Sequence, residues 1–413
     1  MPRLDRAILG RCEPVTSPCG RSRHDVRLRG FFIFREAMSM GLTFRLAVFA
    51  LVLCGGSAHA DEFKIGVIAP TTGPAATVGT RQLSTLQWWE RETNASGGIR
   101  GKTIRLMTCN DEANPEKAAS CGRDLIAQKA VLILNCSVTG AIRATIPLVE
   151  HGPVMLTPAP GVVPPPTGYV FQTSPSDTSL TEVLADYLSM SHITKLGMIA
   201  ATDASGEAAA LRASEVFPRY GIAVDLARID LKATDASTQL AQVAGRDTKV
   251  IFSSYSGGAA AAVVKSYANL GLSQPFVVSY ANVSEQFVRL VRDDLPPRLL
   301  GTALKAVVPD LIDEPAQRQH TLSFIESYEK HSGSKIDQQN LIALGLADTT
   351  AAILTNVDDP ADAATVRDYL QTHPIQSFQT IQFSPISHVG LQTQDLTIVE
   401  FKDGQWKKAA PIQ

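Results

Sequence analysis

The feature that most constrains the fold is the stretch Val131–Gly161, in which two short apolar runs flank one helical segment. The run Val131–Leu134 is too short for an independent helix and is typical of a strand buried on both faces of a parallel sheet. A helix is predicted from Gly140 to about Glu150, and a second strand over Val154–Thr157. The stretch therefore predicts a βαβ unit whose two strands end at the same edge of a sheet.

Each of these two strands is followed by a loop that could contact a ligand. The first loop contains Ser137, Val138 and Thr139 and precedes a helix, where backbone N–H groups and the helix dipole favour an anion such as a carboxylate. The second loop contains Ala159, Pro160 and Gly161. We expect the two loops to line one side of a cleft. An ordinary βαβ unit would show the same pattern, with Ser137 and Thr139 only capping the helix.

The alternation of strands and helices continues along the chain and restarts after a helix that Asp177 is expected to cap. The first set of strands is predicted at 64–69, 103–109, 131–134, 154–157 and 169–171, and the second at 196–201, 223–229, 250–253, 276–278 and 299–307. Long helices at 315–330, 338–356 and 362–370 precede a β ending at 381–383, 396–401 and 406–407. The expected fold class is α/β, with two doubly wound parallel-sheet lobes.

The first 60 residues read as targeting sequence rather than as part of the fold. Arg45 precedes the short apolar run Leu46–Cys54, and an Ala-x-Ala site ends at Ala60, which predicts a signal peptide over residues 38–60 that is cut after Ala60. The apolar run is shorter than the roughly 20 residues needed to span a bilayer. Residues 1–37 are Arg-rich and aperiodic, and we interpret them as an extension of the gene model. We expect a periplasmic protein.

Charge and motifs exclude several function classes. Residues 1–60 hold nine Arg and four acidic residues, so the rest of the chain has 29 basic and 36 acidic groups and a formal charge of −7. This charge argues against a nucleic-acid partner. The sequence contains no nucleophile elbow, P-loop, dinucleotide fingerprint, HExxH or CxxC motif, so we expect no enzyme activity, no cofactor and no metal site.

Three cysteines remain after cleavage at Ala60, which is an odd number for an oxidising compartment. Cys109 ends a predicted strand and Cys121 lies on the following helix, so we favour a Cys109–Cys121 disulfide that leaves Cys136 free in the first loop. A Cys109–Cys136 disulfide is the alternative.

Four motifs in order carry a resemblance to a known family. They are Phe63–Pro74 (a strand and an SGP-like turn), Asn94–Gly101 (NASGGIRG), Cys109–Ala118 (CNDEANPEKA) and Phe171–Asp177 (FQTSPSD). The chain resembles the periplasmic solute-binding proteins of branched-chain amino-acid ABC transporters, the Leu/Ile/Val-binding type. The resemblance extends from residue 61 to about residue 400.

The resemblance implies a type I periplasmic binding fold, in which three crossovers join the lobes. We place the crossovers near 176–180, 303–308 and 384–390, so that lobe 1 comprises 61–177 and 306–386, and lobe 2 comprises 178–305 and 387–413. It further implies a monomer that captures a small carboxylate between the lobes and delivers it to an ABC permease in the inner membrane. A ligand-sensing protein on the same fold is the alternative.

The resemblance also assigns roles to residues. Ser137, Val138 and Thr139 match the loop that holds the ligand carboxylate, and Ala159, Pro160 and Gly161 match the second loop, with Gly161 where amino-acid binders carry Thr. Tyr255 takes the place of an aromatic wall. Ser279 and Tyr280 stand where amino-acid binders carry a Glu that pairs with the ligand ammonium. Asp203 begins a turn that lacks the family's Tyr.

Two ligand hypotheses follow from these departures. In the first, the ligand is an α-amino acid whose ammonium pairs with Asp203 or Glu285 instead. In the second, it is an amine-free carboxylate, such as an aromatic acid that stacks on Tyr255 and Tyr280. A buried ammonium without an acidic partner costs about 3–5 kcal/mol, so the sequence favours the second hypothesis.

Overall fold

The computed structural model describes residues 61–256 and 259–413. The expected signal peptide, its cleavage site and the segment before it lie outside the described residues, so these expectations remain predictions. Within the described ranges, the helices are all too short or too polar to cross a bilayer.

The first sheet has six parallel strands in the order β13-β5-β4-β3-β1-β2. Their bounds are β1 (Glu62–Ile68), β2 (Thr103–Cys109), β3 (Leu132–Asn135), β4 (Val154–Thr157), β5 (Val170–Pro175) and β13 (Val389–Leu391). Every residue of β3 and β4 is buried, because helices cover both faces of the sheet.

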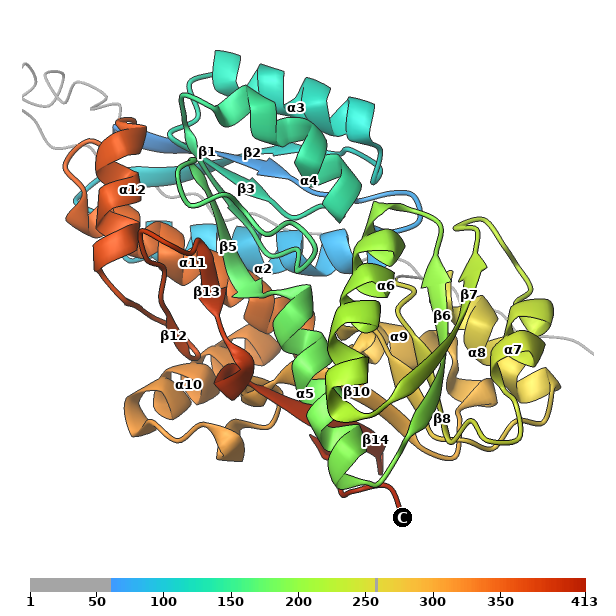
Figure 1. The fold of residues 1–413 in the computed structure, drawn as a ribbon. Helices are drawn as coiled ribbons and strands as arrows, with labels where there is room; N and C mark the ends of the chain where they lie inside the picture. Colours follow the sequence, from blue (N-terminus) through green and yellow to red (C-terminus); the bar gives the residue numbers. More distant parts are fainter. Residues whose placement is uncertain (1–60, 257–258) are drawn as a thin grey trace, which may run out of the picture. The chain divides into compact units, whose positions relative to one another are not determined.

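Alternating residues of β1 face different helical layers. Ile65 and Val67 pack into a core with α2 (Ala76–Ala95) and α11 (Gln338–Asn356), which lie on one face of the sheet (Figure 1). Ile68 packs on the opposite face against α3 (Pro115–Ala127) and α4 (Thr139–Thr145), which η1 (Ile146–Val149) continues. The same core as α2 and α11 also contains side chains of α10 (Pro315–Ser332), α12 (Ala363–Thr372) and a small sheet of β11 (Ile375–Gln376) with β12 (Thr380–Ile381).

The second sheet has seven strands in the order β15-β14-β10-β9-β8-β6-β7. The strands are β6 (Lys195–Ala201), β7 (Ala223–Ile229), β8 (Val250–Ser253), β9 (Phe276–Val278), β10 (Leu299–Leu304), β14 (Leu396–Lys402) and β15 (Gln405–Lys408), and the last two run antiparallel to their neighbours. Helices α5 (Asp177–Met190) and α6 (Ala204–Val216) cover one face. The other face carries α7 (Ser237–Val243), α8 (Ala260–Asn269) and α9 (Glu285–Leu290) (Figure 1). The predicted α/β class with two parallel-sheet lobes is confirmed.

The third passage between the sheets comes later in the chain than the sequence suggests. The prediction placed it at 384–390 and began lobe 2 at residue 387. Strand β13 instead pairs with β5 of the first sheet through Val389 and Leu391. The chain therefore moves to the second sheet between β13 and β14, because the buried side chains of Val389 and Leu391 extend the core of the first lobe.

A covalent link joins β2 to α3. Cys109 and Cys121 form a disulfide with Cα atoms 5.7 Å apart, and Cys136 is buried and free. This is the pairing that the sequence favoured over a Cys109–Cys136 disulfide. Helix α3 begins with the Asn114 side chain accepting from the backbone N–H groups of Glu116 and Lys117 and with Pro115 in the first helical position. The link fixes this helix beside the strand end that leads toward the loops of the predicted site.

Candidate functional site

A pocket of about 380 Å³ lies where the strands of both sheets end. Most of its wall is formed by the segments that follow β1, β3, β4, β5, β6, β8 and β9, and residues after β2 and β7 and on β10 and α11 complete it. Carboxyl ends of parallel strands are the usual place for ligands in such folds, and the volume lies in the range of roughly 300–1,000 Å³ typical of small-molecule sites. Most of the wall is apolar, with large side chains from both lobes: Val78, Leu180, Leu184, Leu231, Phe252, Val278 and Ile342.

The first predicted loop lines this pocket with all three of its residues, Ser137, Val138 and Thr139. The Ser137 hydroxyl donates a hydrogen bond to the buried carboxylate of Asp111. The Thr139 hydroxyl has no partner among the described residues. Neither hydroxyl caps α4, whose N-cap is Val138. Thr139 is therefore the side chain in this loop with a hydroxyl proton available to a ligand.

Backbone groups beside Thr139 add further donors. In the described part of the chain, no group accepts a hydrogen bond from the backbone N–H of Thr139, Gly140 or Ala141. These N–H groups begin a helical segment, so they carry the positive end of its dipole. Together with the Thr139 hydroxyl they form a set of donors suited to a carboxylate.

The second predicted loop also lines the pocket through Ala159, Pro160 and Gly161. The Arg143 guanidinium donates to the Gly161 carbonyl oxygen over 2.8 Å and so holds this loop against α4. A Cβ atom on Gly161 would lie 2.9 Å from Thr139 Oγ1 and 3.0 Å from Asp177 Oδ2. The missing side chain therefore leaves room for the Thr139 hydroxyl and the Asp177 carboxylate on either side of this residue.

Asp177 is a pocket residue that the sequence analysis read only as a helix cap. The N-cap of α5 is instead Ser176, whose hydroxyl accepts from the backbone N–H of Ser179, and Asp177 is the first helical residue. Its carboxylate lines the pocket and has no hydrogen-bond partner among the described residues. Burial raises the pKa of Asp177 to about 6, an effect that the positive charges of Arg212 and Arg143 partly offset. Its place directly after β5, at the same edge as the two loops, was the signal available in the sequence.

Tyr255 does not form an aromatic wall, and that prediction is wrong. Its side chain is fully buried in the core of the second lobe, and its hydroxyl donates to the carbonyl oxygen of Asp230 over 2.7 Å. The pocket is lined instead by its two neighbours, Ser254 and Ser256. The extended chain after β8 alternates its side chains, so the large apolar ring takes the core side and the small polar residues take the pocket side.

Tyr280 lines the pocket as predicted, but its ring packs with the core of the first lobe although it follows β9 of the second sheet. Two glutamines at the start of α11 hold the same segment. Gln338 Nε2 donates to the Tyr280 carbonyl oxygen over 2.5 Å, and Gln339 Nε2 donates to that of Ala281 over 2.9 Å. This segment therefore fastens the second lobe to the first at the pocket edge.

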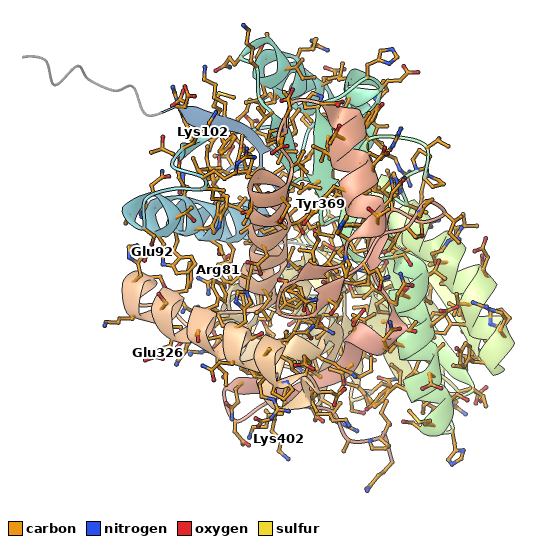
Figure 2. The ribbon with its side chains drawn as sticks, turned by 90° about the vertical axis from the view of Figure 1, so that its left-hand side faces the viewer. Arg81, Glu92, Lys102, Glu326, Tyr369 and Lys402 are labelled. Carbon is orange, nitrogen blue, oxygen red and sulfur yellow. A yellow bond between two sulfur atoms is a disulfide. The ribbon has the colours of Figure 1, made fainter. Side chains whose placement is uncertain are left out.

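The start of α11 is itself anchored to α2. Asp337 caps α11, and its Oδ2 lies 3.3 Å from Nε of Arg81, which is labelled on α2 in Figure 2. Gln82, the next residue on α2, donates through Nε2 to Gln339 Oε1 over 2.7 Å. The glutamines that hold the second lobe are thus fixed to two helices of the first.

The pocket wall carries negative but no positive side chains. Of the described residues that line it, Asp177 and Asp203 are the acids, and none is Lys, Arg or His. Asp203 caps α6, with Oδ1 accepting from the Gly206 backbone N–H over 2.9 Å. Glu285, the other acid considered in the sequence, does not line the pocket and forms an ion pair with Arg289 at 2.6 Å. The described residues contain no cluster of three or more His, Cys, Asp or Glu that could hold a metal ion.

The sequence matches a family model described as "Periplasmic binding protein" over residues 62–405. The chain belongs to the periplasmic binding protein family. This membership confirms the resemblance drawn from the four motifs, and it confirms that the chain is a member of a binding-protein family rather than an enzyme.

Two curated relatives of this periplasmic binding protein have names that refer to amino acids. The Leu/Ile/Val-binding protein homolog 3 of Brucella melitensis is 30% identical over 155 residues, which cover 37% of this chain and 42% of that protein. An amino acid binding protein of Pseudomonas aeruginosa is 24% identical over 349 residues, 81% of this chain and 90% of that protein. The match to the first relative thus spans less than half of its length.

Solved structures share the fold of this periplasmic binding protein at low sequence identity. An extracellular ligand-binding receptor from Rhodopseudomonas palustris superposes with a TM-score of 0.77 at 18% identity, over 85% of this chain and all of that chain. A branched-chain amino acid transporter substrate-binding protein from Streptococcus pneumoniae, in complex with isoleucine, has a TM-score of 0.71 at 18% identity, over 85% and 99% of the two chains. A solute-binding protein of an R. palustris ABC transporter, in complex with benzoate, has a TM-score of 0.70 at 18% identity, over 84% and 95%.

Proposed function

We propose that this chain is the extracytoplasmic solute-binding protein of an ABC importer, which captures a small carboxylate between its lobes and delivers it to a permease in the inner membrane. The observation that carries the proposal is the pocket of about 380 Å³ at the strand ends of both sheets, with free donors beside Thr139. Export through the predicted signal peptide, with cleavage after Ala60, is part of the same proposal.

The pocket chemistry fits a ligand that is charged at one end and apolar at the other. A carboxylate would accept hydrogen bonds from the Thr139 hydroxyl and from the free N–H groups at the start of α4. The apolar body would lie against side chains of both lobes, such as Leu180 and Phe252. Burying such a body stabilises the complex by about 25 cal/mol per Å².

Delivery to a permease requires two states of the protein, one open and one closed on the ligand. Within the part of the chain that the structure describes, three passages connect the lobes, and hinge closure around a ligand is a common motion of such folds. A ligand that contacts both Thr139 in the first lobe and Ser279 in the second would favour the closed state.

The relatives with known ligands support this class without fixing the ligand of this chain. The structure from S. pneumoniae holds isoleucine and that from R. palustris holds benzoate. Calorimetry of the purified mature protein with leucine, valine and benzoate tests the proposal. We expect at least one of these to bind with micromolar or tighter affinity, and Thr139→Val to weaken every ligand that binds.

The matched control is Thr355→Val on α11, because the Thr355 hydroxyl is exposed and bonds only within its own helix. That variant should bind as the wild type does. Equal loss in both variants, or undiminished binding in Thr139→Val, would argue against this pocket as the binding site.

A ligand-sensing role on the same fold is the second candidate, supported by structural neighbours described as extracellular ligand-binding receptors. Uptake of labelled ligand by cells with and without the gene separates the two roles. Loss of uptake supports transport, and unchanged uptake with a lost transcriptional response supports sensing.

A further inference from the structure

We propose that the ligand carries an ammonium group next to its carboxylate, and that Asp177 binds this ammonium and thereby selects α-amino acids over amine-free acids. This inference rests on the proposed function and names its ligand class. It reverses the preference for an amine-free acid that the sequence alone suggested. That preference relied on the missing Glu after β9 and on two tyrosines that were expected to line the pocket.

The side chains of Thr139 and Asp177 both approach Gly161. Thr139 Oγ1 and Asp177 Oδ2 lie 2.9 and 3.0 Å from the same point, the position that a Cβ on Gly161 would take. In an α-amino acid a single carbon atom separates the carboxylate from the ammonium. The donor for one group and the acceptor for the other must therefore lie close together, as the Thr139 hydroxyl and the Asp177 carboxylate do around this position.

The charge of the pocket wall also favours a zwitterion over an anion. An amine-free anion would meet the carboxylates of Asp177 and Asp203, with no cationic side chain among the described residues of the wall. A zwitterion places its own positive charge against this negative field. The Asp203 carboxylate already caps α6, whereas that of Asp177 has no hydrogen-bond partner among the described residues. Asp177 is therefore the acid available to an ammonium.

Among the described residues, no cationic side chain pairs directly with Asp177. Arg143 on α4 donates to the Gly161 carbonyl oxygen, and Arg212 on α6 forms an ion pair with Glu215 at 2.7 Å. Both lower the pKa of Asp177 only through longer-range attraction, and burial still raises it to about 6. A bound ammonium would supply the close partner that the ionised carboxylate lacks.

The other acid considered as a partner for the ammonium does not line the pocket. Glu285 pairs with Arg289 outside the pocket wall. Ser279 and Tyr280, at the position where amino-acid binders carry Glu, offer no carboxylate. The ammonium partner would thus come from the residue that directly follows β5, on the same side of the pocket as the carboxylate donors.

The test compares pairs of ligands that differ only in the amine: leucine with 4-methylpentanoate, valine with 3-methylbutanoate, and phenylalanine with 3-phenylpropanoate. Calorimetry at pH 7.5 should show that the wild type binds at least one amino acid about 100-fold or more tightly than its amine-free partner. Asp177→Asn should remove this preference while leaving the affinity for the amine-free acid unchanged or higher. Asp186→Asn is the matched control, because Asp186 is an exposed acid on the same helix and does not line the pocket; this variant should keep the preference.

The outcomes separate this inference from the proposed function. If the wild type binds only amine-free acids, or both members of a pair equally, the role of Asp177 is overturned and the solute-binding function stands. If no carboxylate binds, both fail. Should Asp177→Asn not fold, the wild type still decides. Between pH 7.5 and pH 5 its affinity for the amino acid should fall as Asp177 is protonated, and constant affinity would overturn the role of Asp177.

Discussion

The Ser137 hydroxyl donates its hydrogen bond to the carboxylate of Asp111, a residue with no exposed surface. Burial raises the pKa of Asp111, and the bond from Ser137 works in the opposite direction. Since a hydroxyl has one proton to donate, the Ser137 proton is used inside the protein, whereas the hydroxyl of Thr139, two residues later, lines the pocket without a partner among the described residues. Two hydroxyls that look equivalent in the sequence therefore have different tasks.

Single substitutions should separate these tasks. Ser137→Ala leaves the buried Asp111 carboxylate without its donor and should lower the free energy of unfolding by about 1–3 kcal/mol. Thr139→Val keeps the shape of the side chain and should mainly weaken ligand binding. Urea denaturation and calorimetry on both variants measure the two effects. A Ser137→Ala protein that is as stable as the wild type but no longer binds ligand would contradict this division.

Asp177 should make the ligand-free protein less stable at neutral pH. Its pKa is raised from 3.8 to about 6, so folding disfavours the ionised form. The favourable contribution is fully present below about pH 4 and is lost as the pH rises through 6. Asp177→Asn should thus raise the free energy of unfolding by about 1–2 kcal/mol at pH 8, allowing for solvent screening of a partly exposed group.

The same substitution should have little effect on stability at pH 3.5, where Asp177 is protonated in the folded chain and mostly protonated in the unfolded chain. Urea unfolding at the two pH values measures the difference. A stabilisation that is equal at both would indicate that the raised pKa is not its cause.

Tyr255 and Tyr280 are both buried, but only the hydroxyl of Tyr255 has a hydrogen-bond partner among the described residues, so the two allow a comparison of what each hydroxyl contributes to stability. Tyr255→Phe removes a hydroxyl that donates to the Asp230 carbonyl oxygen and should cost about 1 kcal/mol of unfolding free energy without changing ligand affinity. The Tyr280 hydroxyl is buried and has no partner among the described residues, so Tyr280→Phe should leave stability unchanged or slightly higher. Thermal unfolding of both variants compares them. A larger loss in Tyr280→Phe would mean that its hydroxyl has a partner.

The link between β2 and α3 should contribute to stability through the loop that it closes. Cys109 and Cys121 are separated by 12 positions, and closing a loop of this size stabilises a folded chain by about 3 kcal/mol. The Cys109→Ser, Cys121→Ser double variant should unfold at lower temperature in oxidising buffer. A reductant should then lower the melting temperature of the wild type but not that of the variant. Equal melting temperatures without reductant would show that the link adds nothing.

Short buried strands were the most predictable part of the fold. The runs that became β3 and β4 are apolar throughout because both of their faces are covered, and this pattern is visible without knowledge of the partners. Strand β13 was not predicted, because its three residues become a strand only through pairing with β5, more than 200 positions earlier in the chain. The third passage between the lobes was misplaced for the same reason.

In the site, the two loops after β3 and β4 were predictable because strand ends identify them. The direction in which single side chains point could not be predicted from the sequence. Tyr255 lies between two serines that face the pocket, and only the packing of the second lobe turns its ring away. Asp177 fits the sequence pattern of a helix start, so the sequence offered no separate sign that its carboxylate also lines the pocket.

Cys136 lies in the pocket wall, is 1% exposed, and is the one free cysteine among the described residues. Burial raises the pKa of its thiol to about 12, so reagents should modify it only during moments when the lobes separate. The rate of Cys136 alkylation would then report how often the lobes open spontaneously. A ligand that holds the lobes together should lower this alkylation rate, so that closure can be followed without an added label.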